Sequence, residues 1–250
     1  MESKNPLNLF KEIKIEMAIT VLLTVLMAFF WKHSWFVTIS LFVIFVVAMF
    51  LWERRPYDLP IYIVIFLLAP LIDLNAIPAG AWFYGNPDAF NIPFWLFTGY
   101  ALGLLVLVRI GETTYRVLNH ELDPNKPSVT PRKNVKRGLF EVIGGFFIHL
   151  LLILTIVMLW HKPIIAALIL IGLFLIQKAI WEKHPYDNYI FVMTLIFATI
   201  VEWVSVYYGS WTYPNPAILN VALYIPFAYS LASVNVFKIF LGYQKIISKK

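Results

Sequence analysis

The sequence contains no cysteine, and only 14% of its 250 residues are charged. The absence of cysteine excludes disulfides, thiolate catalysis and Cys-ligated zinc or iron–sulfur centres. Soluble domains carry about 25% charged residues and about 45–50% apolar ones. Here 60% of the residues are hydrophobic and the mean hydropathy is +0.76. A soluble fold of this size could not bury so much apolar surface, so we expect lipid to be the solvent for much of the chain.

Histidine is also scarce, and its five copies are scattered along the chain without the spacing of metal ligands. No glycine pattern suitable for cradling phosphate occurs either. We therefore expect no metal and no cofactor. The net charge of +6 comes from basic residues at the ends of apolar runs, which is the pattern of membrane topology rather than of nucleic-acid binding. We expect no nucleic-acid partner.

Eight apolar segments have about the length of 20 residues that crosses a hydrocarbon core of about 30 Å. Because lipid requires each segment to pair its own backbone groups, these segments are predicted to be helices. The first of them shows no small-residue cleavage site, so we interpret it as a spanning helix and not as a signal peptide. The sequence thus predicts an all-α polytopic membrane protein with these spans: 14–31, 35–52, 59–76, 92–110, 142–160, 163–181, 188–205 and 218–238.

The basic residues also predict the orientation. Eight spans place nearly all of them on one side, including Arg54, Arg55 and the basic cluster between residues 111 and 137, whereas the other side holds almost only Lys32 and Lys162. Basic loops remain on the cytoplasmic side of a membrane. We therefore expect a multi-pass protein of the inner or plasma membrane with both termini in the cytoplasm.

An internal repeat with an offset of 129 residues runs through the whole chain. It equates Trp31 with Trp160, Asp73 with Glu202, and the segment 80–87 with the segment 209–216. Such a register, held from the first span to the fourth, indicates a duplication. We predict two tandem four-helix repeats, residues 1–110 and 138–250, joined by a cytoplasmic linker, residues 111–137. Because each unit holds an even number of spans, the repeats should be parallel and related by a pseudo-twofold axis along the membrane normal.

The motif Trp-Glu-x-x-Pro-Tyr-Asp occurs at the cytoplasmic end of both repeats, ending at Asp58 and Asp187. An acidic residue at the start of a helix caps free N–H groups and complements the positive helix end. Glu53 and Glu182 could pair with neighbouring basic residues. We interpret this motif as structural, as a capped helical hairpin.

The outer motif Asp/Glu-x6-Gly-x-Trp-x-Tyr-x-Asn-Pro begins at Asp73 and at Glu202. Asp73 follows Asp58 by 15 residues, or about 22 Å of helix, which places both carboxyl groups just inside the outer edge of the hydrocarbon. An ionisable group at that depth is a candidate functional group, and burial favours its neutral form, which can donate a proton. The alternative, an acid that bonds to loop amides, stays open.

The loop after each acid brings large rings close to it, namely Trp82 and Tyr84 in the first repeat and Trp211 and Tyr213 in the second. Ring faces stabilise a cation by about 0.5–2 kcal/mol each, but Trp and Tyr also form interfacial belts in membrane proteins. His149 lies inside the fifth span, with Thr20 as its counterpart. It is a candidate substrate-binding residue or proton carrier, or else a histidine bonded to a neighbouring helix.

An acid followed by Gly-x-Trp-x-Tyr and a long apolar helix resembles small carotenoid-modifying membrane proteins, the heterodimer-type lycopene cyclases and carotenoid hydratases. The run Pro-Tyr-Asp-Asn-Tyr at 185–189 is similar to a cyclase segment, although the Pro-x-Glu-Glu motif of those cyclases is absent. The resemblance implies an isoprenoid substrate, with Asp73 or Glu202 as the acid.

Three hypotheses follow from these observations. The first is an enzyme that protonates a double bond of an isoprenoid or carotenoid-like substrate, with Glu202 and Asp73 as catalytic acids, and that cyclises, isomerises or hydrates it. The second is a small transporter or lipid-binding protein, and the third is a scaffold without catalysis. Membrane lipid or an isoprenoid is the expected partner, and a homo-oligomer is left open.

Overall fold

The computed structural model describes residues 7–52, 55–119, 133–181 and 183–247, with side chains from residue 10 onward. These residues form eight helices and one two-stranded sheet. The elements of the first half are α1 (Leu7–Phe29), α2 (Ser34–Leu51), α3 (Asp58–Ala76), β1 (Phe83–Tyr84) and α4 (Trp95–Leu118). Those of the second half are α5 (Val135–Leu159), α6 (Pro163–Ile180), α7 (Asp187–Tyr207), β2 (Trp211–Thr212) and α8 (Ile225–Ile247).

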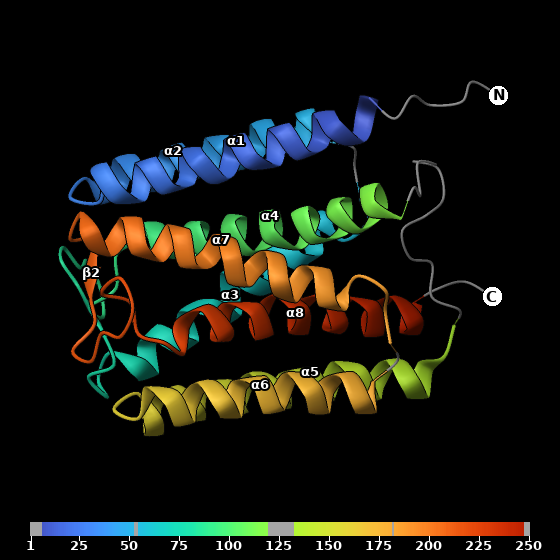
Figure 1. The fold of residues 1–250 in the computed structure, drawn as a ribbon. Coiled ribbons are helices and arrows are strands. Elements are labelled where there is room, and N and C mark those ends of the chain that lie inside the picture. The colour runs from blue at the N-terminus through green and yellow to red at the C-terminus, as the bar shows by residue number, and fades with distance from the viewer. Residues whose placement is uncertain (1–6, 53–54, 120–132, 182, 248–250) are drawn as a thin grey trace.

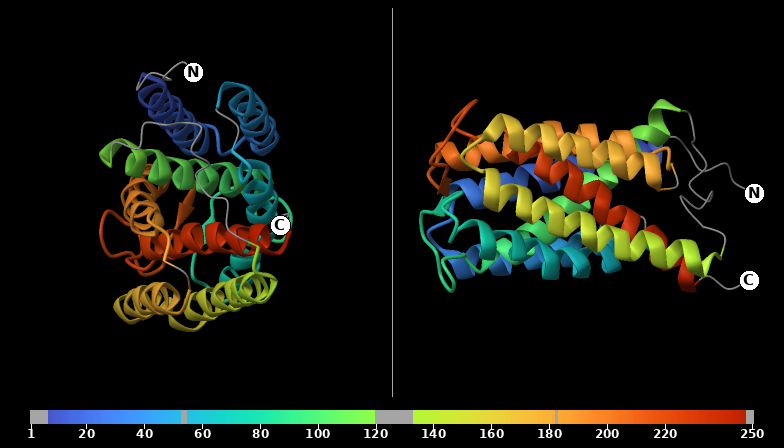
Figure 2. Two further views of the ribbon diagram at one scale, coloured as in Figure 1. Left: turned by 90° about the vertical axis from the view of Figure 1, so that its right-hand side faces the viewer. Right: turned by 90° about the horizontal axis from the view of Figure 1, so that it is seen from below.

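The helices run side by side, with the pair α1 and α2 on one flank, the pair α5 and α6 on the opposite flank, and the other four between them (Figure 1). The view along the bundle shows α4 and α8 crossing its middle (Figure 2). The start of α1 and the end of α8 lie at the same end of the bundle, and the strands lie at the other end. The chain is therefore a polytopic helical bundle with an even number of crossings.

Two helices, α4 and α8, form the centre of the bundle. In each of them 83% of the most apolar window is buried, against 28–39% for the other five candidate spans. Those outer helices expose large apolar side chains such as Phe50, Met158 and Ile164, as expected where lipid is the solvent. Seven of the eight described helices are long and apolar enough to cross a membrane. The exception, α1, begins with charged residues, of which Glu12 and Glu16 are buried inside the protein.

The two predicted repeats are present, and their contacts are equivalent. α4 packs on α1, α2 and α3 as α8 packs on α5, α6 and α7, and the halves join where α4 contacts α7 and α3 contacts α8. The strands pair antiparallel, with Phe83 opposite Thr212. These two residues are equivalent by the offset of 129, so their pair lies on the pseudo-twofold axis. The parallel duplication is thus a structural one.

The predicted spans agree with α2, α3, α6 and α7 within two residues at each end, but not with the others. α4 and α8 begin three and seven residues later than predicted and end eight and nine residues later. Both helices begin late because a tight turn precedes each of them, with positive φ at Phe90 and Asn91 and at the equivalent Leu219 and Asn220. Before α4, Asp88 also accepts hydrogen bonds from Ser34 Oγ and from Phe94 N. At the other end, α4 reaches Leu118 and α5 begins at Val135, so both ends of the predicted linker are helical. Most of the linker, Glu53 and Glu182 lie outside the described residues.

Candidate functional site

The first predicted acid, Asp73, is fully buried near the end of α3. Its Oδ1 accepts a hydrogen bond of 2.9 Å from Trp82 Nε1 and one of 2.6 Å from the Tyr84 hydroxyl. Its Oδ2 makes no hydrogen bond among the described residues. The rings reach back to the acid through the turn that follows α3, in which Gly80 has a φ of +83° that is open to glycine and costly for other residues.

The second acid, Glu202, is built in the same way and carries one more donor. Trp211 Nε1 and the Tyr213 hydroxyl donate to its Oε2 at 2.8 and 2.6 Å. The Tyr229 hydroxyl, from α8, donates to its Oε1 at 2.8 Å. The carboxyl groups thus bond to indole and phenol donors, not to loop amides as the structural alternative supposed.

The two acid clusters meet at the pseudo-twofold axis. Trp82 of the first half packs edge-on against Tyr213 of the second, with ring centroids 6.2 Å apart, and Tyr84 packs likewise against Trp211 at 6.0 Å. Burial first, and then the neighbouring carboxyl group, raises the pKa of the Tyr84 and Tyr213 phenols well above the ordinary value. Both rings therefore stay protonated donors at neutral pH.

An elongated cavity lies on the same axis beneath this aromatic cluster, with a volume of about 100 Å³. Its wall on α4 extends from Trp95 to Leu107, which is about 18 Å of helix. The wall is almost wholly apolar, and Glu202 reaches it whereas Asp73 does not. Equivalent residues of the two halves face it in pairs: Trp82 and Trp211, Tyr84 and Tyr213, Tyr100 and Tyr229, Gly103 and Ala232, Leu107 and Val236.

His149, the remaining predicted site residue, also lines the cavity, and so does its counterpart Thr20. His149 is 5% exposed, and its Nε2 lies 3.4 Å from the carbonyl oxygen of Leu68 in α3. Leu68 precedes Asp73 by five residues, so His149 lies about 7–8 Å deeper in the bundle than the acid. The structure thus brings the predicted rings to the acids and leaves His149 as a separate polar group.

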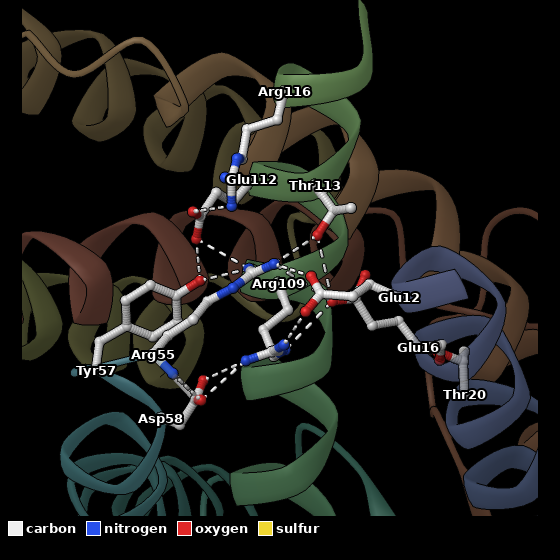
Figure 3. A network of polar contacts seen from close by, with 10 residues as sticks. All are labelled: Glu12, Glu16, Thr20, Arg55, Tyr57, Asp58, Arg109, Glu112, Thr113 and Arg116. Atoms are coloured by element: carbon white, nitrogen blue, oxygen red, sulfur yellow. Dashed lines mark hydrogen bonds and ion pairs between the residues drawn. The ribbon is translucent and has the colours of Figure 1, made fainter. Parts of the chain in front are cut away.

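A buried charge network closes the bundle at its other end (Figure 3). Arg109 of α4 donates to both oxygens of Asp58 at 2.8 and 2.9 Å and to Glu16 at 3.2 Å, and its guanidinium lies 4.3 Å from the Trp52 ring centroid. Arg55 bonds to Glu12 at 2.6 Å and Glu112 at 3.0 Å. Arg116 and Thr113 complete the network.

The second half holds a smaller version of this network. Lys238 pairs with Asp187 at 2.7 Å, and Lys245 pairs with Glu141 at 2.8 Å. Asp58 and Asp187 were expected to cap their helices, but neither provides a side-chain cap. Each instead accepts from the backbone N–H three residues earlier, at 2.9 and 3.0 Å, and binds a buried cation of the central helix.

Sequence reasoning missed several residues of both regions. The offset of 129 would have found them, because it equates Tyr100 with Tyr229, Arg109 with Lys238, and Glu12 with Glu141. Among the described residues no group of three or more histidine or acidic side chains could hold a metal ion. The arrangement can offer a slender apolar cavity, phenol donors and one carboxyl group at its wall.

Comparison with known proteins finds a similar fold among solved structures. No protein-family model matches the sequence, and neither does a curated protein. The fold resembles that of an Insig homologue. The crystal structure of this homologue from Mycobacterium vanbaalenii aligns with a TM-score of 0.54 at 15% identity, over 76% of this chain and 96% of that one. A cross-linked trimer of the homologue aligns at 0.51, with 16% identity over 74% and 95% of the chains. At such identities the likeness establishes a polytopic helical membrane fold alone.

Proposed function

We propose that this protein binds a lipophilic molecule in the cavity between its two halves. The observation that carries the proposal is the position of that cavity, which is apolar, lies on the pseudo-twofold axis and ends at a cluster of buried tyrosines and acids. Ligand sites in helical bundles are mostly apolar clefts between helices with few convergent polar groups. The lipid-binding hypothesis drawn from the sequence is the one that this arrangement supports best.

The dimensions of the cavity favour a slender occupant. A cavity volume of about 100 Å³ spread over about 18 Å of helix suits one slender unbranched or isoprenoid chain. Both central helices contribute small residues to the wall, Gly99 and Gly103 from α4 and Ala228 and Ala232 from α8. A β-carbon added at Gly103 would meet no atom within 4 Å, so this position borders open space.

Gly103 gives a direct test. We would purify the full chain in mild detergent, extract it and identify the retained lipids by mass spectrometry. Gly103→Leu should fill the cavity and expel the ligand. Gly172→Leu on α6 is the matched control, because this glycine also has open space around it and does not line the cavity. If the wild type and both variants retain only bulk phospholipid, the proposal is wrong.

Catalysis is a second candidate function, favoured by one observation, namely that Glu202 lines the cavity. In the enzyme hypothesis Glu202 protonates a double bond of an isoprenoid or carotenoid-like substrate, and the rings of Trp211 and Tyr213 stabilise the cation. A reaction run in deuterated water would place deuterium on a product carbon, and Glu202→Gln should abolish this incorporation. Ligand binding without deuterium uptake would leave only the binding function.

We also infer that both termini lie in the cytoplasm, because the basic residues gather at their end of the bundle. The chain has no cysteine, so single cysteines report the sides of the membrane without background. A membrane-impermeant thiol reagent should label Asn215→Cys in intact cells and Lys136→Cys only after permeabilisation. The opposite labelling would show that the orientation is reversed.

Light scattering in detergent would test whether the protein forms a homo-oligomer, since the Insig homologue of similar fold has been crystallised as a cross-linked trimer.

A further inference from the structure

His149 lines the cavity and carries a buried hydrogen-bond acceptor without a partner among the described residues. Its Nε2 lies 3.4 Å from the Leu68 carbonyl oxygen, which can only accept, so Nε2 carries the hydrogen. His149 is buried and forms no ion pair in the described part of the chain, which favours the neutral imidazole. Its other nitrogen is then an acceptor. That nitrogen, Nδ1, is buried and has no hydrogen-bond partner among the described residues.

The equivalent position of the first half differs in this respect. Thr20 also lines the cavity, but its hydroxyl donates to the Glu16 carbonyl oxygen one turn earlier in α1, at 2.9 Å. The polar group of the first half is thus satisfied within its own helix, and that of the second half is not. The cavity therefore has nearly equivalent walls and one polar difference at this depth.

We propose that His149 Nδ1 accepts a hydrogen bond from a hydroxyl group of the bound lipid and so fixes the orientation of this lipid in the cavity. The inference rests on the proposed lipid-binding function and names its ligand class, a slender long-chain or isoprenoid alcohol. The hydroxyl group lies on the α5 side of the cavity, and the apolar chain follows the walls of α4 and α8. A buried acceptor without a donor is costly, and an alcohol supplies the missing donor whereas an ether or hydrocarbon does not.

Two competing compounds distinguish the contribution of the hydroxyl group to binding from the contribution of the apolar chain. Tritiated geranylgeraniol would be bound to the full-length protein in detergent and displaced either by unlabelled geranylgeraniol or by its methyl ether, which has the same chain without a donor. On the wild type the ether should compete about tenfold more weakly, the effect of one buried hydrogen bond. Equal competition by the two compounds would overturn the inference and leave lipid binding intact. A wild type that binds neither compound would sink both proposals.

Two substitutions at His149 distinguish its bond to Leu68 from its bond to the ligand. His149→Gln places an amide near the position of Nε2, keeps a donor for Leu68 and removes the acceptor at Nδ1, so it should abolish the preference for the alcohol. His149→Asn places its amide near the position of Nδ1 and should retain that preference. Thr155→Val on α5 is the control, because its hydroxyl bonds to the Leu151 carbonyl oxygen within the same helix and the residue does not line the cavity. It should leave the preference unchanged. If His149→Gln prefers the alcohol as strongly as the wild type does, ordered water rather than the ligand satisfies Nδ1, and the inference is wrong.

Discussion

Tyr100 and Tyr229 occupy equivalent positions in the two halves, and their hydroxyl oxygens lie 3.3 Å apart. The pair stands between the two buried acids, because Tyr229 bonds to Glu202 and Tyr100 interacts electrostatically with Asp73. The duplication has thus created a polar contact on its own symmetry axis. The two acid sites form one connected cluster instead of two separate ones.

Tyr229→Phe should destabilise the protein more than Tyr100→Phe does. The first change removes the 2.8 Å hydrogen bond to Glu202 Oε1, and a buried acceptor left without its donor costs about 1–3 kcal/mol. The second change removes the longer contact between the two hydroxyl groups and the electrostatic interaction of Tyr100 with Asp73, but no hydrogen bond to Glu202. Thermal unfolding in detergent measures both variants. Equal losses would show that the contact between the tyrosines matters as much as the bond to the acid.

The pairing of the halves can be tested by a cross-link. Phe83 and Thr212 are partners in the antiparallel sheet, and paired residues have Cα atoms about 4.5–5.5 Å apart, within the range that a disulfide spans. Phe83→Cys combined with Thr212→Cys should therefore form a disulfide under mild oxidation. If a protease site introduced in the linker is then cleaved, the disulfide keeps the two halves together, and they migrate as one band on a non-reducing gel. Phe83→Cys combined with Asn215→Cys is the control, and oxidation of both pairs to equal extents would contradict the register.

The sequence predicted the membrane fold, the repeat and the contact of the rings with their acids. Those predictions succeeded because the length of an apolar run and the repeat at an offset of 129 residues can both be recognised in the sequence without knowledge of any contact. It did not predict that α4 and α8 are the buried centre, although their hydropathy is lower than that of the lipid-facing candidate spans. Arg109 in α4 and Lys238 in α8 distinguish these two helices from the lipid-facing ones, because a cation within a membrane helix needs a partner inside the protein.

Other features required three-dimensional contacts. No pattern in the sequence predicted that Arg109 would bind Asp58 and Glu16, because these residues come from three separate helices. The cavity was equally hidden, since its wall combines residues of both halves at equivalent depths. The roles of Asp73, Glu202 and His149 remain predictions that the experiments above address.

Gly111 and Gly103 lie two turns apart on α4 and should respond in opposite ways to alanine. A β-carbon at Gly111 would lie 2.6 Å from the Ile190 Cα in α7, whereas one at Gly103 would meet nothing within 4 Å. Gly111→Ala should separate the two helices and cost about 1–3 kcal/mol. Gly103→Ala should be neutral or slightly stabilising, because alanine favours the helix. Unfolding temperatures in detergent decide the matter, and a neutral Gly111→Ala would show that α4 and α7 can move apart freely.

High pH should destabilise the fold through Tyr84 and Tyr213. Burial and the adjacent carboxyl groups raise the pKa of both phenols in the folded state, whereas in the unfolded chain they titrate near the usual value of about 10. The folded state then holds more protons above about pH 10, so the free energy of unfolding falls as the pH rises. Replacing both tyrosines by phenylalanine should flatten this slope. Growth of tyrosinate absorbance at these positions before any unfolding would contradict the expectation.

Arg109→Met should be among the most damaging single changes at the charged end of the bundle. It leaves Asp58 and Glu16 buried without the guanidinium that binds both of them, whereas Glu12 keeps its ion pair with Arg55. Breaking a buried ion pair from one side costs about 3–5 kcal/mol. Lysine should not rescue the site, because one ammonium group cannot reproduce the bidentate bond to Asp58 and the stacking on Trp52. Adding Asp58→Asn to Arg109→Met should restore part of the stability, since it removes one uncompensated charge. Lys178→Met removes a hydrogen bond to Asn188 and a weaker electrostatic interaction with Asp187, but breaks no ion pair found among the described residues, and is the control for the loss of a basic side chain. If the double variant is as unstable as the sum of its two single changes, the pair is uncoupled and the network does not act as a unit.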